Sequence, residues 1–549
     1  MTVPSTSDGR QVRPAIPADS RNAPDAVIVS PAATAAPTAV LQAVVFFGGF
    51  ASIGSELAIS RLIAPYFGAS TFIWATIIGL NLTFLSLGYW WGGRVADRRP
   101  SARVLFGITA VAAVAIALLP LLARPILGTS LAAFQNLDVG AFYGALVGTL
   151  LLMALPLTLL GFVTPFAIRL RLHDVRAAGN TAGSVYALST VGSIAGSFVP
   201  VLLLIPNLGA ARTFVALGLA LLIPSVIGLF SVRAFTPGAL AVLAVALLPF
   251  MAVAQPAGVR PPEGGTLLTE RESTYNYIQV VQENGRNLLI LNDGHAIHSI
   301  YDPANLLTGG PWDYFMAAPL VVDGASPDSV RQAMFIGLAG GTAARQLTAA
   351  YGPIPIDGVE IDPDIVNVAR EYFGLDELPN VRAIVADGRY ALKTSSAHYD
   401  LIGVDAYRQP YIPFQLTSAE FFDEVADRLT PNGVAVVNVG RTQTDYRLVD
   451  AISSTMAHVF DHVYAVDVDS YMNTIVIGTN APSSIANIAA NAERFPPESP
   501  VRTVAGWIAA DGSPRRVEPG SIVFTDDKAP VEQVIDQIIL DAAREVTGQ

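Results

Sequence analysis

Long apolar stretches fill the first half of this sequence and constrain its fold more than any other feature. Most of them approach the roughly 20 residues that a helix needs to cross a bilayer, and Glu56 is the one acidic residue inside them. A water-soluble bundle could not hide so many apolar runs, and the whole chain has a mean hydropathy of +0.47 with only 14% charged residues. We therefore predict a multi-span α-helical membrane domain at residues 38–255, with candidate spans at 38–60, 70–93, 104–127, 141–164, 182–206, 213–231 and 238–255.

Charge differs sharply between the two halves of the chain. Residues 1–256 contain 14 arginines, no lysine and 7 acidic residues, whereas residues 257–549 contain 19 basic and 38 acidic residues. An acidic second half argues against a nucleic-acid partner, which requires a basic face. The chain has no cysteine, which excludes disulfides, thiolate metal sites and a cysteine nucleophile.

Two polar segments divide the chain. Residues 1–37 are rich in Ala, Pro, Ser and Asp without an apolar period, which predicts a disordered tail. Residues 256–265 are rich in Pro and Gly and predict a linker. A second domain is expected at 266–549.

The second domain begins with a predicted β-hairpin, formed by strands at 277–281 and 287–291 around the turn Glu283-Asn284-Gly285. Strands and helices then alternate, which predicts an α/β domain with a parallel sheet covered on both faces. The strands are expected at 333–337, 355–361, 381–386, 399–405 and 433–439, the helices at 341–351, 363–373, 418–429 and 446–459, and two further strands within 462–479.

Acidic residues follow three of these strands, close to a glycine-rich turn. The turn lies at 337–341, and 19 residues after Gly341 the next strand ends at Glu360. Glu360 could accept both hydroxyls of a ribose, and the glycines would let a nucleotide approach the backbone closely. Asp387 and Asp405 end the next two strands, where open α/β sheets bind ligands. Each acid also has a structural alternative, as a surface, turn or helix-capping residue.

These motifs resemble the spermidine synthase family, and the helical half resembles its membrane-spanning branch. In the α/β half the resemblance lies in Glu272 to Tyr275, Asn292 to Gly294, Gly337 to Thr342, Glu360 to Asp362, Asp387-Gly388, Tyr399 to Ile402 and Asp405 to Pro413. In the helical half it lies in Gly183 to Thr190 and Leu204 to Gly209.

The resemblance implies a Rossmann-like, adenosylmethionine-dependent transferase domain with a small N-terminal β-hairpin. The implied enzyme moves an aminopropyl group from decarboxylated S-adenosylmethionine to an amine such as putrescine, which gives spermidine. No metal is implied, and His295 and His298 form no metal-ligand set with other acids. The acid matching Asp405 would deprotonate the attacking amine. The nucleoside would lie at Asn276, Gly337, Gly340, Glu360, Asp387 and Gly388, and the amine at Tyr275, Asp313 and Tyr407.

Three departures from the family pattern leave the acceptor open. Ala339 and Arg408 stand where polyamine synthases carry aspartates, and the family's histidine before the glycine turn falls near Asp313. Two carboxylates that would hold a diamine are thus missing. A methyltransferase that uses intact adenosylmethionine, with Arg408 meeting its carboxylate, is one alternative. A transporter or sensor with a non-catalytic nucleoside-binding domain is another.

Arginines predict which loops face the cytoplasm. The loops at 94–103 and 169–176 are arginine-rich and are both expected on the cytoplasmic side. Three candidate spans follow the second loop, which would put the α/β domain outside. Its expected donor is made in the cytosol, so we expect a cytosolic domain on a multi-pass protein of the cell membrane and leave the number of spans open. A homodimer is compatible with this arrangement.

Overall fold

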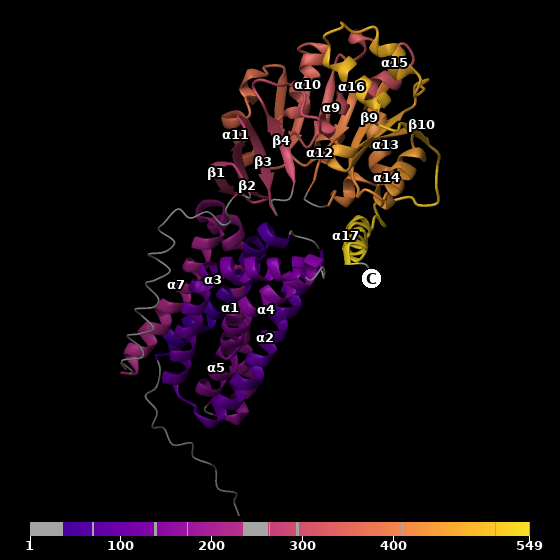
Figure 1. Ribbon diagram of the computed structural model, residues 1–549. Coiled ribbons are helices and arrows are strands. Elements are labelled where there is room, and N and C mark those ends of the chain that lie inside the picture. The colour runs from indigo at the N-terminus through magenta and orange to yellow at the C-terminus, as the bar shows by residue number, and fades with distance from the viewer. Residues whose placement is uncertain are drawn as a thin grey trace, which may run out of the picture.

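The structure is a computed structural model that describes residues 37–549 apart from 68–70, 137–139, 173, 234–261, 263, 293–295, 408–410, 511 and 548–549. Most of the predicted tail and linker, the candidate span at 238–255, His295 and Arg408 therefore lie outside the described residues. Figure 1 shows an elongated helical bundle with a rounder α/β domain at one of its ends.

The helical half follows the prediction closely. Five helical stretches are long and apolar enough to cross a membrane, and the last of them runs from Val175 to Ser231. Gly209 interrupts that stretch with a φ of +78°, a left-handed value that glycine adopts without strain. The kink lies between the predicted spans 182–206 and 213–231. The helices are α1 (Thr38–Phe67), α2 (Thr71–Arg98), α3 (Ala102–Asn136), α4 (Gly140–Gly161), α5 (Val163–Arg171), α6 (Ala178–Val199) and α7 (Ile205–Ser231).

Small residues let these helices approach closely. A Cβ atom on Gly192 of α6 would lie 2.0 Å from the carbonyl oxygen of Phe46 in α1, and one on Gly88 of α2 would lie 2.2 Å from that of Thr158 in α4. Helices in lipid pack through such small-residue contacts, because lipid tails are as apolar as the side chains they replace. Inside the bundle Asn81 donates a hydrogen bond to Glu56, so the acid has a neutral partner there.

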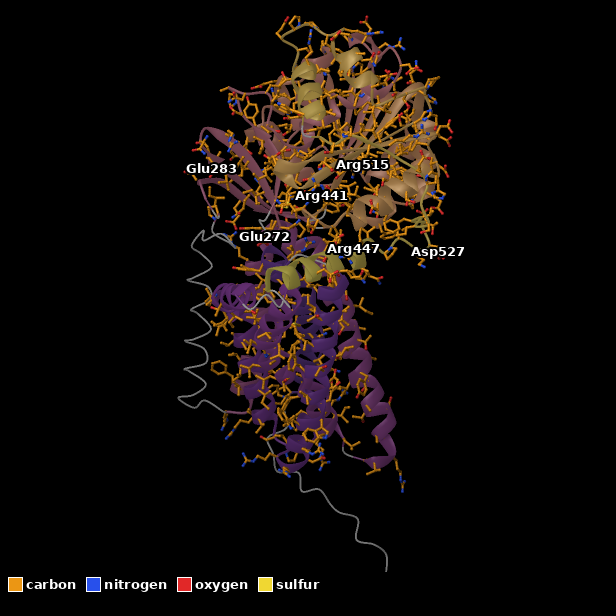
Figure 2. All side chains as sticks on the ribbon, turned by 45° about the vertical axis from the view of Figure 1, so that its right-hand side comes forward. Glu272, Glu283, Arg441, Arg447, Arg515 and Asp527 are labelled. Carbon is orange, nitrogen blue, oxygen red and sulfur yellow. The ribbon has the colours of Figure 1, made fainter. Side chains whose placement is uncertain are left out.

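The arginine-rich loops and the α/β domain lie at opposite ends of the bundle. At one end Arg169 pairs with Asp97 at 3.4 Å, and Arg103 lies 3.5 Å from the carbonyl of Val232. At the other end Glu272, at the base of the α/β domain in Figure 2, accepts a hydrogen bond from the N–H of Ala210. The predictions of a cytosolic α/β domain and of cytoplasmic arginine-rich loops therefore exclude each other. The length of the bundle separates the domain from the loops, so a membrane spanned by the helices would lie between them.

The α/β half begins with a four-stranded antiparallel sheet in the order β1-β2-β3-β4. Glu283 pairs with Arg286, so a two-residue loop joins β2 to β3. Asn284 and Gly285 both have positive φ, as a tight hairpin turn requires, and the predicted turn is confirmed. The strands are β1 (Thr266–Glu272), β2 (Tyr277–Glu283), β3 (Arg286–Leu291) and β4 (Ile297–Tyr301).

The main sheet has eight strands in the order β12-β10-β11-β9-β8-β5-β6-β7. The five strands from β9 to β7 are parallel and carry helices on both faces, so the predicted α/β fold is confirmed. The sheet is mixed rather than wholly parallel, because β11 runs antiparallel to β9. Its strands are β5 (Ala333–Ile336), β6 (Ile356–Glu360), β7 (Val381–Val385), β8 (Tyr399–Val404), β9 (Leu429–Gly440), β10 (His462–Val468), β11 (Asn473–Thr479) and β12 (Arg515–Val517).

Helices and short turns complete this domain, and several of them fall outside the predicted set. The predicted helices are α10 (Thr342–Tyr351), α11 (Pro363–Tyr372), α13 (Ala419–Arg428) and α14 (Arg447–Ala457). The additional ones are α9 (Pro311–Phe315), α12 (Gly388–Thr394), α15 (Asn487–Ala492), α16 (Pro500–Ala510) and α17 (Val531–Thr547), the last of which lies beside the upper end of the bundle in Figure 1.

Candidate active site

A cavity of about 970 Å³ lies at the carboxyl ends of the parallel strands. Because β5, β6, β7 and β8 run in parallel, the residues that follow them meet at one edge of the sheet. Glu360, Asp387 and Asp405 all line this cavity. The three acids predicted from separate strand ends are therefore brought together. Other predicted site residues that line it are Gly337, Gly388, Tyr275, Asn276 and Tyr407.

The glycine turn after β5 shapes the floor of the cavity. Gly337 has a φ of +91°, and a Cβ atom there would lie 2.4 Å from the carbonyl oxygen of Asp405. Only glycine allows both the conformation and the close approach of the two strand ends. Gly340, which was also predicted to bind the nucleoside, is not among the lining residues. Its N–H donates to the hydroxyl of Ser299 at 2.8 Å, so it joins the turn to β4.

Glu360 ends β6 and is only 7% exposed. Its two carboxylate oxygens accept hydrogen bonds from the N–H groups of Ala339 at 3.0 Å and Asp362 at 3.1 Å. Burial raises its pKa to about 7, and the backbone donors oppose that rise. A carboxylate held in this way has remaining lone pairs that can accept from ribose hydroxyls.

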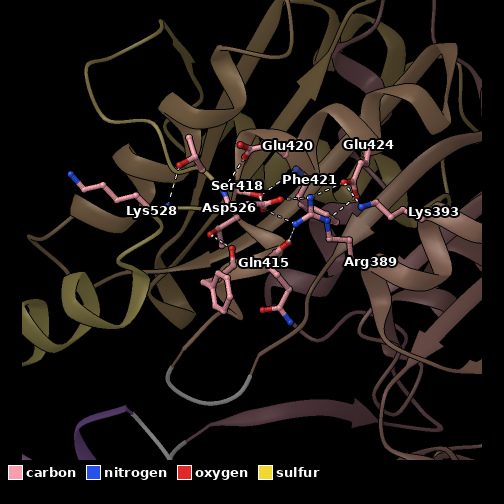
Figure 3. A network of polar contacts seen from close by, with 12 residues as sticks. Arg389, Lys393, Gln415, Ser418, Glu420, Phe421, Glu424, Asp526 and Lys528 are labelled. Carbon is pink, nitrogen blue, oxygen red and sulfur yellow. Dashed lines mark hydrogen bonds and ion pairs between the residues drawn. The ribbon is translucent and has the colours of Figure 1, made fainter.

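Asp387 lines the cavity and also caps α12, where it accepts from the N–H of Tyr390 at 3.0 Å. The structural and ligand-binding interpretations of Asp387 are therefore compatible. Figure 3 shows how α12 is held: the guanidinium of Arg389 pairs with Glu424 at 2.6 Å and with Asp526 at 2.7 Å. This paired arginine fixes the helix whose first turn presents Asp387 and Gly388 to the cavity.

Asp405 follows β8 and has polar neighbours that stabilise its charged form. One carboxylate oxygen accepts from the amide of Asn438 at 2.9 Å, and the indole of Trp312 is a second donor. Burial outweighs both and raises the pKa of Asp405 to about 6. Near neutral pH this carboxylate is therefore largely ionised and can accept a proton.

The connection between β1 and β2 supplies another wall of the cavity. Tyr275 is 42% exposed and is free to contact a ligand with its ring. The Asn276 amide is already bonded to Asp362 at 2.9 Å and to Asn292 at 3.0 Å, so its first role is to hold the wall in place. The Tyr407 hydroxyl likewise donates to the carbonyl of Asn438 at 2.9 Å, which leaves its ring to line the cavity.

The structure does not bring Asp313 to the cavity. This side chain is fully buried and accepts from the N–H groups of Thr308 and Gly309 and from the amide of Gln346. It organises the loop before α9 and cannot hold an amine there. Its neighbour Trp312 reaches Asp405 instead, because adjacent residues of a short helix point in different directions.

His298 and Arg61 are among the lining residues that were not predicted from the sequence. His298 of β4 faces the cavity, burial lowers its pKa to about 4, and its Nε2 atom has no hydrogen-bond partner among the described residues. Arg61 comes from α1 of the bundle and donates to the carbonyl of Thr274, next to Tyr275. The helical half thus contributes a wall to the cavity, which no motif of the α/β half could indicate.

Comparison with known proteins finds a family whose model matches part of the α/β half. The family model described as the spermine/spermidine synthase domain matches residues 314–486. A polyamine aminopropyltransferase of Vibrio vulnificus is 34% identical over 206 residues, which cover 36% of this chain and 67% of that protein. The chain belongs to the spermidine synthase family. A probable polyamine aminopropyl transferase of Bifidobacterium longum is 35% identical over 296 residues, 50% of this chain and 65% of that relative, so the match spans slightly under two thirds of its length.

The family likeness extends into the helical half. A polyamine aminopropyltransferase of Mycobacterium tuberculosis is 26% identical over 418 residues, which cover 70% of this chain and 77% of that protein. That share of the chain is larger than residues 266–549 alone can supply. The helical extension is therefore shared, at least in part, with a relative in the spermidine synthase family.

Substitution of Asn438 should shift the pH dependence of catalysis. Asn438→Ala removes a donor that stabilises the ionised form of Asp405, so the pKa of Asp405 should rise above about 6 by up to about one unit. In the general-base role expected of Asp405 the deprotonated form is the required one, so the acid-side fall in kcat/KM should begin at a higher pH. Asn473→Ala is the matched control, since Asn473 donates to Asn438 at 2.8 Å and makes no hydrogen bond to Asp405 among the residues that the structure describes. An unchanged acid limb in Asn438→Ala would contradict this assignment.

Substitution of Arg61 tests the contribution of the bundle. Arg61→Ala removes the cation that holds the carbonyl of Thr274, and the loop carrying Tyr275 should loosen. We expect KM for the substrates to rise by about tenfold with kcat nearly unchanged, because the contact affects binding rather than the reacting atoms. Arg212→Ala, an exposed arginine near the same end of the bundle, should leave KM unaltered. Equal effects of the two substitutions would argue against a specific role for Arg61.

Proposed function

We propose that this protein is a membrane-bound polyamine aminopropyltransferase. Its donor would be decarboxylated S-adenosylmethionine, and its acceptor an amine of the putrescine type. The observation that carries the proposal is the single cavity in which Glu360, Asp387 and the half-buried Asp405 meet beside the glycine turn. Membership in the spermidine synthase family supports the same reaction.

The cavity offers a place for each part of the donor. Gly337 lets the nucleoside approach the strand end, Glu360 accepts from the ribose hydroxyls, and Asp387 accepts from the adenine amino group. The sulfonium would then lie toward Asp405 and Tyr407. A cationic donor fits a cavity lined by four acids, Glu360, Asp387, Asp405 and Glu532, against one arginine, Arg61, because carboxylates favour positive charge.

Asp405 performs the proton transfer in this proposal. An ammonium has no free lone pair, so the acceptor must lose a proton to the Asp405 carboxylate before it attacks. The amine nitrogen then bonds to the propyl carbon next to sulfur, and the carbon–sulfur bond breaks. Its electron pair returns to sulfur and leaves neutral methylthioadenosine. Alignment of amine and carbon in one enclosed cavity supplies much of the rate.

The bundle would anchor the enzyme in a lipid bilayer. Five helical stretches have the length and hydropathy for this role. Exposed apolar side chains such as Leu82, Leu155 and Phe198 lie on the outside of the bundle, where lipid would cover them. A lipid bilayer is therefore proposed as a partner, in addition to the two small-molecule substrates.

Product analysis tests the reaction directly. The full-length chain in detergent is offered decarboxylated S-adenosylmethionine with a panel of mono-, di- and polyamines, and the products are identified by mass spectrometry. We expect methylthioadenosine and an amine heavier by one aminopropyl group. S-adenosylhomocysteine formed from intact adenosylmethionine would instead show a methyltransferase. Tight nucleoside binding without any product would show a binding domain, and both results would overturn the proposal.

A further inference from the structure

The two ends of the helical bundle differ in their arginine content. Eight arginines lie at the end away from the α/β domain, three lie within helices toward the domain, and the remaining three precede the described residues. The eight are Arg94, Arg98, Arg99, Arg103, Arg169, Arg171, Arg176 and Arg233. The three are Arg61, Arg124 and Arg212.

Contacts between helices place the eight arginines at one end. The ion pair of Arg169 with Asp97 joins the end of α5 to the end of α2. The contact of Arg103 with the carbonyl of Val232 joins the start of α3 to the end of α7. Only residues 99–101 separate α2 from α3, so the two contacts bring these four helix ends together at one end of the bundle.

The α/β domain is attached to the opposite end. Arg61 near the end of α1 donates to Thr274, and the N–H of Ala210 at the start of the last apolar segment donates to Glu272. A second cavity of about 190 Å³ lies along this junction and is lined by Arg61, Trp74 and Ile205 of the bundle and by Tyr275, between β1 and β2. Contacts at both ends of the bundle therefore place the arginine-rich loops at one end and the α/β domain at the other.

We infer that the α/β domain and its cavity face the extracytoplasmic side of the membrane. Arginines in short loops near helix ends are retained in the cytoplasm, and eight against three is a strong bias. The 38 acidic residues of the second half do not oppose this orientation, because long domains cross the membrane largely regardless of charge. The inference concerns sidedness and does not depend on which reaction the cavity performs.

This orientation has a consequence for substrate supply. Combined with the proposed function, it makes the acceptor an amine drawn from outside the cytoplasm. A sulfonium nucleoside is charged and crosses hydrocarbon only at high cost. If its synthesis is cytosolic, a transport step must deliver the donor to the cavity.

The absence of cysteine in the whole sequence makes the orientation measurable. Single cysteines are introduced into the full-length chain at exposed positions of the α/β domain, Ser396→Cys and Glu498→Cys, and of the arginine-rich loops, Pro100→Cys and Ala177→Cys. Intact spheroplasts are treated with a membrane-impermeant maleimide, and parallel samples are treated after permeabilisation. Labelling in the permeabilised samples shows that each cysteine is present and reactive.

The two pairs of variants should respond in opposite ways. We expect both α/β cysteines to be labelled in intact spheroplasts, and both loop cysteines only after permeabilisation. The reverse pattern would overturn the inference and place the domain in the cytosol. Labelling of all four positions in intact spheroplasts, or of none, would overturn it as well, since neither pattern fits a single outward orientation. Product analysis in detergent is independent of sidedness, so failure of one proposal does not imply failure of the other.

Discussion

Asp405→Asn should lower the rate of aminopropyl transfer by about 10²–10⁴-fold, the usual contribution of a positioned general base. The amide cannot accept a proton from the attacking ammonium, although it has nearly the same size as the carboxylate. Donor binding should change little, because Glu360, Asp387 and the glycine turn remain in place. Single-turnover rates and calorimetric titration with the donor measure the two quantities separately.

The Asp405→Asn result also distinguishes the base from a structural acid. Asn438 donates to Asp405 through its amide nitrogen, and an asparagine at 405 can still accept through its side-chain oxygen. The fold should therefore persist, which an unchanged melting temperature would show. Activity near that of the original chain would remove Asp405 from the proposed mechanism. A large loss of thermal stability would favour a structural role.

Glu360→Gln should weaken donor binding by at least tenfold. Each oxygen of Glu360 now accepts one backbone N–H, from Ala339 and from Asp362. Glutamine would turn an NH₂ group toward one of these donors and offer the ribose a weaker acceptor, and hydrogen bonds to a charged group contribute about 1.5–3 kcal/mol each. Titration of the full-length variant with methylthioadenosine measures the loss without any requirement for turnover.

The same carboxyl group predicts a pH dependence of binding in the unaltered chain. The pKa of Glu360 is raised to about 7 by burial, so its ionised form is lost as the pH falls through 7. Affinity for the nucleoside should therefore decrease from pH 8 to pH 6, and Glu360→Gln should abolish that decrease. Asp376→Asn is a matched control, because Asp376 is an exposed acid of the same domain paired with Arg370. A decrease that persists in Glu360→Gln would assign the titration to another group.

Much of the fold could be predicted from local patterns. The apolar runs give the helices of the bundle, because a chain in lipid must satisfy its backbone hydrogen bonds internally. Alternating strands and helices give the parallel part of the main sheet. The antiparallel part was not foreseen, since the pairing of β11 with β9 is a long-range choice that leaves no local signal. Helix α12 was missed because it has only seven residues, too few to show a helical period, and it begins directly after Asp387.

The site residues that follow parallel strands could be predicted from the sequence. Those that reach the cavity through contacts between segments far apart in the chain could not. Glu360, Asp387 and Asp405 converge because parallel topology forces them to one edge. Asp313 was expected in the site because the family's histidine before the glycine turn falls near it, but it accepts from the N–H groups of its own loop. Arg61 lies 213 residues before Thr274, and only the docking of the two halves brings them together.

Because residues of the bundle line the cavity, changes in the bilayer around the bundle should affect the cavity. Arg61 and Ala75, from α1 and α2, border the same space as Glu360 and Asp405. Helices adapt to a thinner or thicker bilayer by changing their tilt, and such a change would move Arg61 relative to the hairpin. With the bundle in a bilayer, as proposed above, lipid chain length should affect the kinetics alongside substrate concentration and pH.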